Sequence, residues 1–270
     1  MIKDIRAGLS INHMSLGTGN ENALMMHCTL SSARAIAPLA MAFQDRFTTT
    51  AFDMPSHGQS ADWDFNGDLQ DRMTKIAESF IQTPIHLIGH SFGATVALRL
   101  MAKMPECIKS VVLFEPVFAE AALQRTPKMR VPYEAQTQKF AQAMNNSDNE
   151  RATMEFLTMW GDGTPWDAIP PHLRQSMVDK IAVVEAGTPA LHRDDHGLLG
   201  PEGLTNYTGP ALFIRGARSV PIVQEIHAAL IDVMPQALDQ AIEGAGHMVP
   251  MTHQDECVKL MQEFYHKSGF

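Results

Sequence analysis

The stretch PIHLIGHSFGATVALRLMAKM places one serine between two glycines, at the junction of two different apolar patterns. Its first part (84–91) has the length and character of a buried strand, and its second part (92–104) has helical spacing. Such a turn leaves no room for side chains at Gly89 and Gly93, and it holds Ser91 strained with its hydroxyl exposed. The pattern predicts a strand–turn–helix unit with Ser91 as a candidate nucleophile. The plainer alternative is a glycine-rich turn with an incidental serine.

Short apolar runs alternate with helical patterns over most of the remaining chain. Strands are predicted at 23–29, 47–54, 84–91, 111–118, 211–216 and 236–242. Helices are predicted at 31–44, 67–82, 92–104, 220–234 and 252–267. Continuous apolar strands alternating with helices indicate an α/β fold, with a mostly parallel, doubly wound sheet covered by helices on both faces.

Residues 119–208 interrupt this alternation. The segment has helical patterns, proline-rich joints (TPWDAIPP) and no clear strand, and it holds two of the three tryptophans. We expect a helical cap inserted after the strand at 111–118. The predicted domains are therefore a core of residues 1–118 and 209–270, and a cap of residues 119–208.

Composition limits the classes of partner. A net charge of −9 without a basic cluster argues against nucleic-acid binding. No apolar run reaches transmembrane length and no secretory signal is evident, so we expect no membrane contact and a cytoplasmic location. Cys28, Cys107 and Cys257 fit neither a disulfide framework nor a zinc site. We expect a small-molecule substrate and no cofactor or metal, and we leave a homodimer open.

A serine nucleophile needs a base, and one of the 12 histidines has a suitable setting. His247 lies in EGAGHMVPMTHQDE, on a glycine-flanked loop between the last predicted strand and the last predicted helix. Such a loop can bring the imidazole to the Ser91 hydroxyl. His253 is nearby but is expected at the start of the helix. His247 is therefore the candidate general base.

Five motifs occur in an order that resembles the α/β-hydrolase superfamily over nearly the whole chain. They are MHCTLSS (26–32), FDMPSHGQS (52–60), GHSFG (89–93), FIRGARS (213–219) and GAGHMVP (244–250). The resemblance implies that Ser91 is the nucleophile, that His247 is the base, and that the backbone N–H groups of Thr29 and Phe92 form an oxyanion hole. It also implies structural roles for Asp53 and His57.

Two positions depart from the usual family pattern. His27-Cys28 stands where relatives have His-Gly, and Ser56 stands where they have glycine. A backbone donor tolerates a changed side chain, so we expect the oxyanion hole to survive.

The acid of the expected triad is the least obvious member. Most relatives carry an aspartate after the penultimate strand, where this chain has Val220. Some haloalkane dehalogenases instead take a glutamate from the end of the strand after the nucleophile helix, and Glu115 in VVLFEPVF matches that position. A carboxylate in so apolar a run needs a partner, and a histidine N–H would supply one. A strand-end glutamate that bonds local backbone is the alternative, and Asp194 or Asp195 is the rival acid.

Serine with this triad implies acyl transfer to water, and the resemblance favours hydrolysis of a small or medium, largely uncharged carboxylic ester. A thioester, lactone or C–C bond is the alternative on the same triad, and a catalytically weak binding protein is the alternative of another class. Trp160 and Trp166 either roof a pocket or only pack the cap on the core. His27, Cys28 and His90 are further pocket candidates. LHRDDHG (191–197) is read as a solvated loop rather than a metal site.

Overall fold

The computed structural model describes residues 1–270, and its centre is an eight-stranded sheet in the order β1-β2-β4-β3-β5-β6-β7-β8. The strands are β1 (Ile2–Arg6), β2 (Leu9–Leu16), β3 (Glu21–Met26), β4 (Phe47–Phe52), β5 (Ile85–His90), β6 (Ile108–Phe114), β7 (Ala211–Gly216) and β8 (Leu238–Ile242). The six strands from β3 to β8 run parallel, so their carboxyl ends meet at one edge of the sheet. The predicted mostly parallel α/β sheet is confirmed.

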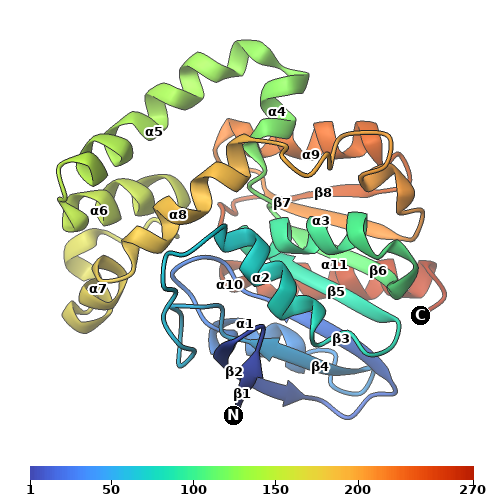
Figure 1. The fold of residues 1–270 in the computed structure, drawn as a ribbon. Helices are drawn as coiled ribbons and strands as arrows, with labels where there is room; N and C mark the ends of the chain where they lie inside the picture. The colour runs from blue at the N-terminus through green and yellow to red at the C-terminus, as the bar shows by residue number, and fades with distance from the viewer.

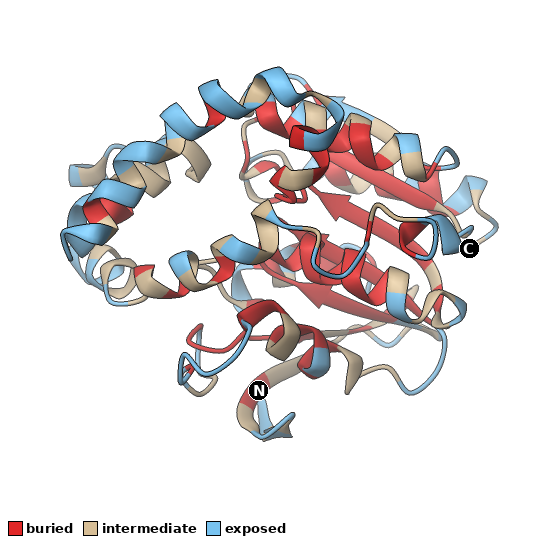
Figure 2. Cartoon of the chain, turned by 45° about the horizontal axis from the view of Figure 1, so that its top comes forward, coloured by how far each residue is buried: buried red, intermediate tan, exposed pale blue.

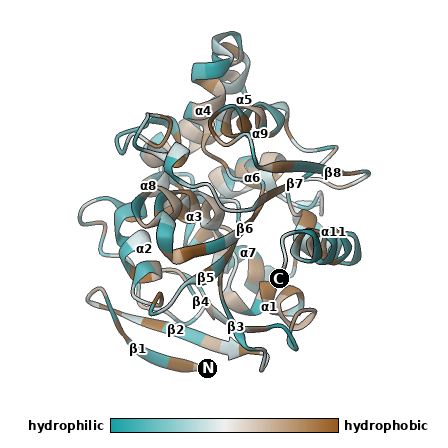
Figure 3. Cartoon of the chain, turned by 90° about the vertical axis from the view of Figure 1, so that its right-hand side faces the viewer, coloured by the Kyte–Doolittle hydropathy of each residue, from teal (hydrophilic) through white to brown (hydrophobic).

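Helices cover both faces of the sheet, as predicted (Figure 1). The helices of this layered core are α1 (Ala33–Met41), α2 (Leu69–Glu78), α3 (Phe92–Lys103), α9 (Pro221–Val233), α10 (Val249–Thr252) and α11 (Gln254–Lys267). One hydrophobic cluster joins the sheet to α2, α3 and α9, and a second joins the opposite face to α1 and α11. Hydrophobic colour follows the central strands in Figure 3, whereas the outward turns of the helices are hydrophilic.

The structure adds a hairpin that the sequence pattern does not predict. β1 and β2 pair antiparallel to each other, and β2 pairs antiparallel to β4. This hairpin extends the sheet on the side away from β8 (Figure 1), and His13 of β2 pairs with Phe52 at the carboxyl end of β4.

The strand predicted at 111–118 is shifted toward the N-terminus. β6 starts at Ile108 and ends at Phe114. Glu115 has a φ of 45°, outside the strand region, and Pro116 follows it without a backbone N–H for the sheet. The backbone therefore turns out of the sheet at Glu115.

Residues 119–208 carry five α-helices and no strand. These helices are α4 (Ala119–Arg125), α5 (Arg130–Asn145), α6 (Asn149–Trp160), α7 (Pro171–Val178) and α8 (Ile181–His192). They lie beyond the carboxyl ends of the parallel strands, above the β5–α3 turn (Figure 1). No helix of the chain is both long and apolar enough to cross a membrane.

Candidate active site

The turn between β5 and α3 presents Ser91 in a strained conformation, with φ 56° and ψ −119°. A side chain at Gly89 would bring its Cβ within 2.7 Å of the Ala94 Cα atom. One at Gly93 would come within 2.5 Å of the Met26 carbonyl oxygen. The two glycines therefore allow the close backbone approach that holds the serine at the apex of the turn.

His247 bridges Ser91 and Glu115. The Ser91 Oγ atom lies 2.9 Å from His247 Nε2, and the Glu115 Oε2 atom lies 2.6 Å from His247 Nδ1. A carboxylate can only accept, so Nδ1 carries the proton and Nε2 is free to accept the serine hydroxyl hydrogen. All three side chains are buried, at the carboxyl ends of β5 and β6 and in the loop after β8.

The Glu115 carboxylate is fully buried and fully bonded. Its Oε1 atom accepts from the Gly216 N–H at 2.6 Å and from the Ser219 hydroxyl. Burial alone would raise the pKa of Glu115, but the hydrogen bonds from His247, Ser219 and Gly216 favour the charged form, and the net pKa is lowered. Glu115 therefore bonds both the backbone, as expected for a strand-end glutamate, and the His247 imidazole, as expected for a triad acid.

Neither rival acid reaches His247. The Asp194 carboxylate accepts from the N–H groups of Leu198 at 2.7 Å and Leu199 at 3.0 Å, which closes a turn after α8. Asp195 pairs with Arg193 at the surface. Both aspartates therefore stabilise the chain around themselves, on the cap side of the molecule.

Two backbone N–H groups near Ser91 make no hydrogen bond within the chain. Thr29 lies just after β3, and Phe92 is the first residue of α3. The N-terminus of a helix carries a partial positive charge from its unpaired N–H groups. The sequence-predicted oxyanion donors are therefore free to bind a negatively charged oxygen beside Ser91.

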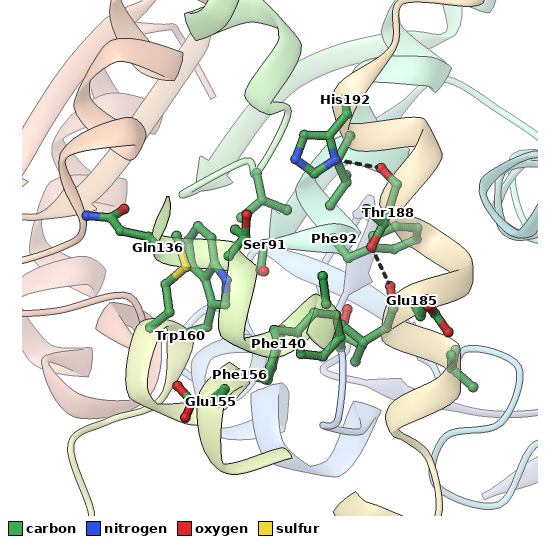
Figure 4. Close-up of a pocket in the computed structure, with 18 of the residues that line it drawn as sticks. Ser91, Phe92, Gln136, Phe140, Glu155, Phe156, Trp160, Glu185, Thr188 and His192 are labelled. Atoms are coloured by element: carbon green, nitrogen blue, oxygen red, sulfur yellow. Dashed lines mark hydrogen bonds between the residues drawn. The ribbon is translucent and has the colours of Figure 1, made fainter. Parts of the chain in front are cut away.

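Two cavities share part of their lining near the catalytic side chains, and only one of them is lined by Ser91. One, the Ser91 cavity, measures about 200 Å³ and lies among α2, α5, α6 and α8 (Figure 4). The other, the second cavity, measures about 410 Å³ and lies between the 28–31 loop and the α6–α7 region. Thr29, Phe156 and Trp160 line both. Neither cavity has a lysine or arginine in its lining.

Of the pocket candidates, Cys28 and Trp160 line these cavities, whereas Trp166 does not. Trp160 meets the His247 ring edge-on, with 4.7 Å between centroids. Trp166 instead lies before α7 against the Arg174 guanidinium. Burial raises the pKa of the Cys28 thiol to about 12, so this thiol stays protonated at neutral pH.

His27 and His90 also lie away from both cavities, because each ring bonds the backbone beneath the site. His27 Nδ1–H donates to the Cys28 carbonyl, and its Nε2 accepts from the Met54 N–H at 3.0 Å. His90 Nε2 donates to the His247 carbonyl at 2.9 Å. Burial lowers the pKa of His27, and it lowers that of His90 to about 3. Both are neutral supports of the surrounding loops.

The structure adds three residues that the sequence analysis misses. Ser219 donates to Glu115. Its position in the loop where relatives carry the acid could have identified it from sequence. Tyr133 and His192 line the Ser91 cavity from α5 and α8, and no pattern in the sequence connects them. His192 Nδ1–H donates to the Thr188 carbonyl at 3.0 Å, so its Nε2 accepts from the Tyr133 hydroxyl at 3.1 Å.

Comparison with known proteins agrees with the fold. The family model described as "Alpha/beta hydrolase family" matches residues 23–260. A pimeloyl-[acyl-carrier protein] methyl ester esterase of Methylococcus capsulatus is 29% identical, covering 82% of this chain and 85% of that protein. A 2-(acetamidomethylene)succinate hydrolase of Mesorhizobium japonicum is 25% identical, covering 95% of this chain and 91% of that protein. The crystal structure of an E-2-(acetamidomethylene)succinate hydrolase superposes with a TM-score of 0.69 at 20% identity, covering 98% of this chain and 99% of that one.

Proposed function

The chain belongs to the alpha/beta hydrolase family and is a hydrolase, and from that premise we propose that it cleaves a small or medium, largely uncharged carboxylic ester through an acyl-serine intermediate. The observation that carries the proposal is the continuous hydrogen-bonded series from Ser91 through His247 to Glu115. A serine hydroxyl held by a correctly tautomerised imidazole is the arrangement that acyl transfer requires.

The proposed reaction begins with attack by the Ser91 oxygen on the ester carbonyl carbon, while its proton passes to His247 Nε2. The carbonyl oxygen becomes negative between the N–H groups of Thr29 and Phe92. Glu115 stabilises the imidazolium, which then protonates the departing alcohol oxygen. Water, deprotonated by the same imidazole, attacks the acyl-serine and releases the acid.

The linings of the cavities support a neutral substrate. A substrate carboxylate would require a cationic partner to replace its hydration. The charged residues lining the cavities are all acidic: Glu185 and Asp162 would repel such a group, and the charge of Glu155 is balanced by Arg151. This argues against a free dicarboxylate such as the succinates named for two relatives, and it agrees better with the ester named for the Methylococcus protein.

The first test is hydrolysis of p-nitrophenyl acetate and butyrate by the native chain and by Ser91→Ala. We expect turnover that falls on the order of 10⁴-fold or more in the variant. The matched control is Ser15→Ala, which removes an exposed serine on β2 and should leave turnover unchanged. Turnover that persists in Ser91→Ala would contradict the proposal.

An inactive native chain that is folded would turn attention to the alternatives. Thioesters, lactones and β-diketones would then be assayed, because the same three side chains can act on each acyl bond. Failure on every class, with a bound ligand detected by calorimetry, would favour a binding role.

A further inference from the structure

The two cavities differ in where they lie relative to the imidazole. Met248, the residue after His247, lines the second cavity and is absent from the lining of the Ser91 cavity. Trp160, whose ring contacts the His247 ring, lines both cavities together with Phe156. Only the second cavity is lined by a direct chain neighbour of His247, and on this ground we place it on the imidazole side of the site.

Ester cleavage fixes the directions of the three groups bonded to the reacting carbon: the carbonyl oxygen, the leaving oxygen and the acyl chain. The carbonyl oxygen must point to the N–H groups of Thr29 and Phe92. Thr29 lines both cavities, so the carbonyl lies where they join. The leaving oxygen must face His247 Nε2, which protonates it. The acyl chain takes the remaining direction, into the Ser91 cavity.

Resting on the proposed function, we propose that the second cavity receives the alcohol portion of the ester and that the Ser91 cavity receives the acyl portion. The wall of Trp160 and Phe156 keeps the two portions apart. This assignment predicts that the size of the alcohol and the length of the acyl chain are limited by the walls of different cavities.

The charge of the second cavity narrows the alcohol further. Asp162 is its one carboxylate, and its Oδ1 atom accepts from the Thr164 N–H at 2.8 Å in the turn after α6. No cation balances it in the lining. The alcohol is therefore neutral or cationic, and an alcohol that bears a carboxylate is disfavoured.

Two ester series test the assignment separately. One varies the acyl group from acetyl to octanoyl on a constant p-nitrophenyl alcohol. The other varies the alcohol from methyl through butyl and benzyl to naphthylmethyl on a constant butyrate, followed by pH-stat. For the native chain we expect a size cut-off in each series, beyond which kcat/KM drops at least tenfold.

Two exposed alanines provide matched variants, since each lines only one cavity. Ala168→Trp narrows the second cavity and should lower the ratio of naphthylmethyl to methyl butyrate kcat/KM at least tenfold, without moving the acyl cut-off. Ala141→Trp narrows the Ser91 cavity and should shift the acyl cut-off to shorter chains, without moving the alcohol ratio. Trp166→Ala lies outside both cavities and serves as the control for altered cap packing.

The outcomes separate this inference from the function on which it rests. If each variant moves the other series, the two portions bind in reversed order. If neither profile moves while turnover still requires Ser91, the cavities are not the subsites and the assignment is wrong. Turnover that survives Ser91→Ala would contradict the proposed function instead.

Discussion

The sheet edge that carries Ser91 and the helices above it are packed in different ways. Ten of the 12 residues of α3 are buried, whereas no residue of α7 is buried (Figure 2). The helices above the sheet share a small hydrophobic cluster of Ala143, Ala152 and Ile181, while the cluster around α3 holds 41 buried residues. The catalytic geometry thus rests on a rigid base, and the cavity walls come from a thinly packed region that can vary in shape.

The contrast extends to buried polar groups. Four buried histidines, His27, His57, His86 and His90, belong to the sheet and its loops. Burial lowers the pKa of each, to about 3 for His57 and His90 and to about 4 for His86. These neutral histidines make the stability of the sheet and its loops sensitive to acid.

The largest effect we predict is loss of stability in acid. A buried neutral histidine has a folded-state pKa below its unfolded value of about 6.5, so the unfolded chain binds the extra proton as the pH falls. The stabilisation is complete above pH ~6.5 and is lost toward pH ~4, at about 1.4 kcal/mol per pH unit for each histidine. Urea unfolding at pH 7.5, 6.5 and 5.5 should show a flat region and then a steep fall.

His86→Gln checks this assignment at a site remote from Ser91. The variant should reduce the fall between pH 6.5 and 5.5 by about 1 kcal/mol, whatever its effect at pH 7.5. A fall that is identical in the variant would mean that other groups govern acid unfolding.

The next effect in size concerns Glu115. Glu115→Gln keeps the shape but removes the charge that stabilises the imidazolium, so we expect kcat to fall about 10³- to 10⁴-fold with little change in KM. Glu243→Gln, an exposed glutamate in the loop before His247, is the matched control. Nearly unchanged turnover in Glu115→Gln would reject Glu115 as the triad acid.

A smaller effect is expected for the wall between the cavities. Trp160→Ala should join the two cavities, because Trp160 lines both and covers the edge of the His247 ring. The ratio of kcat/KM between the best and the worst ester of each series should then fall about tenfold. Trp166→Ala should change kcat/KM less than about twofold, since it lines neither cavity. Equal effects in the two variants would indicate that the helices above the site act as one packed unit.

The smallest effect concerns the contact that joins the two regions. α8 packs on the nucleophile turn through Gly187, where a Cβ atom would lie 2.7 Å from the Phe92 ring. Gly187→Ala should lift α8 slightly and raise KM about two- to threefold, because the ring can yield. A tenfold fall in kcat would contradict the distinction between the two regions, because the nucleophile turn would then shift together with the helices above it.

The residues at the sheet edge of the site were largely predictable from sequence, because short local motifs determine their positions. Two constraints act within a few residues of the chain. Close backbone approach requires glycine at Gly89 and Gly93, and a charge in an apolar run marks Glu115 as a residue with a specific partner. The direction of a side chain is a different matter. His90 and Trp166 have the right residue type for a pocket, yet neighbouring backbone and Arg174 engage them elsewhere.

The cavities and the N-terminal hairpin were not predictable for physical reasons. Tyr133 and His192 meet only because α5 and α8 pack across the cavity, and these weakly amphipathic helices carry no pairing signal. β1 pairs at the sheet margin with exposed residues such as Ile2 and Ile5, so its apolar pattern does not mark a core strand.

The position of the acid after β6 has a consequence for how the protein is made. Ser91, Glu115 and both candidate oxyanion N–H groups belong to the first 115 residues, whereas His247 belongs to the final tenth of the chain. Chains fold from the N-terminus during synthesis at about 5–20 residues per second. A nascent chain therefore carries the nucleophile and the acid without the imidazole that joins them, until the segment with His247, 132 residues after Glu115, has been made.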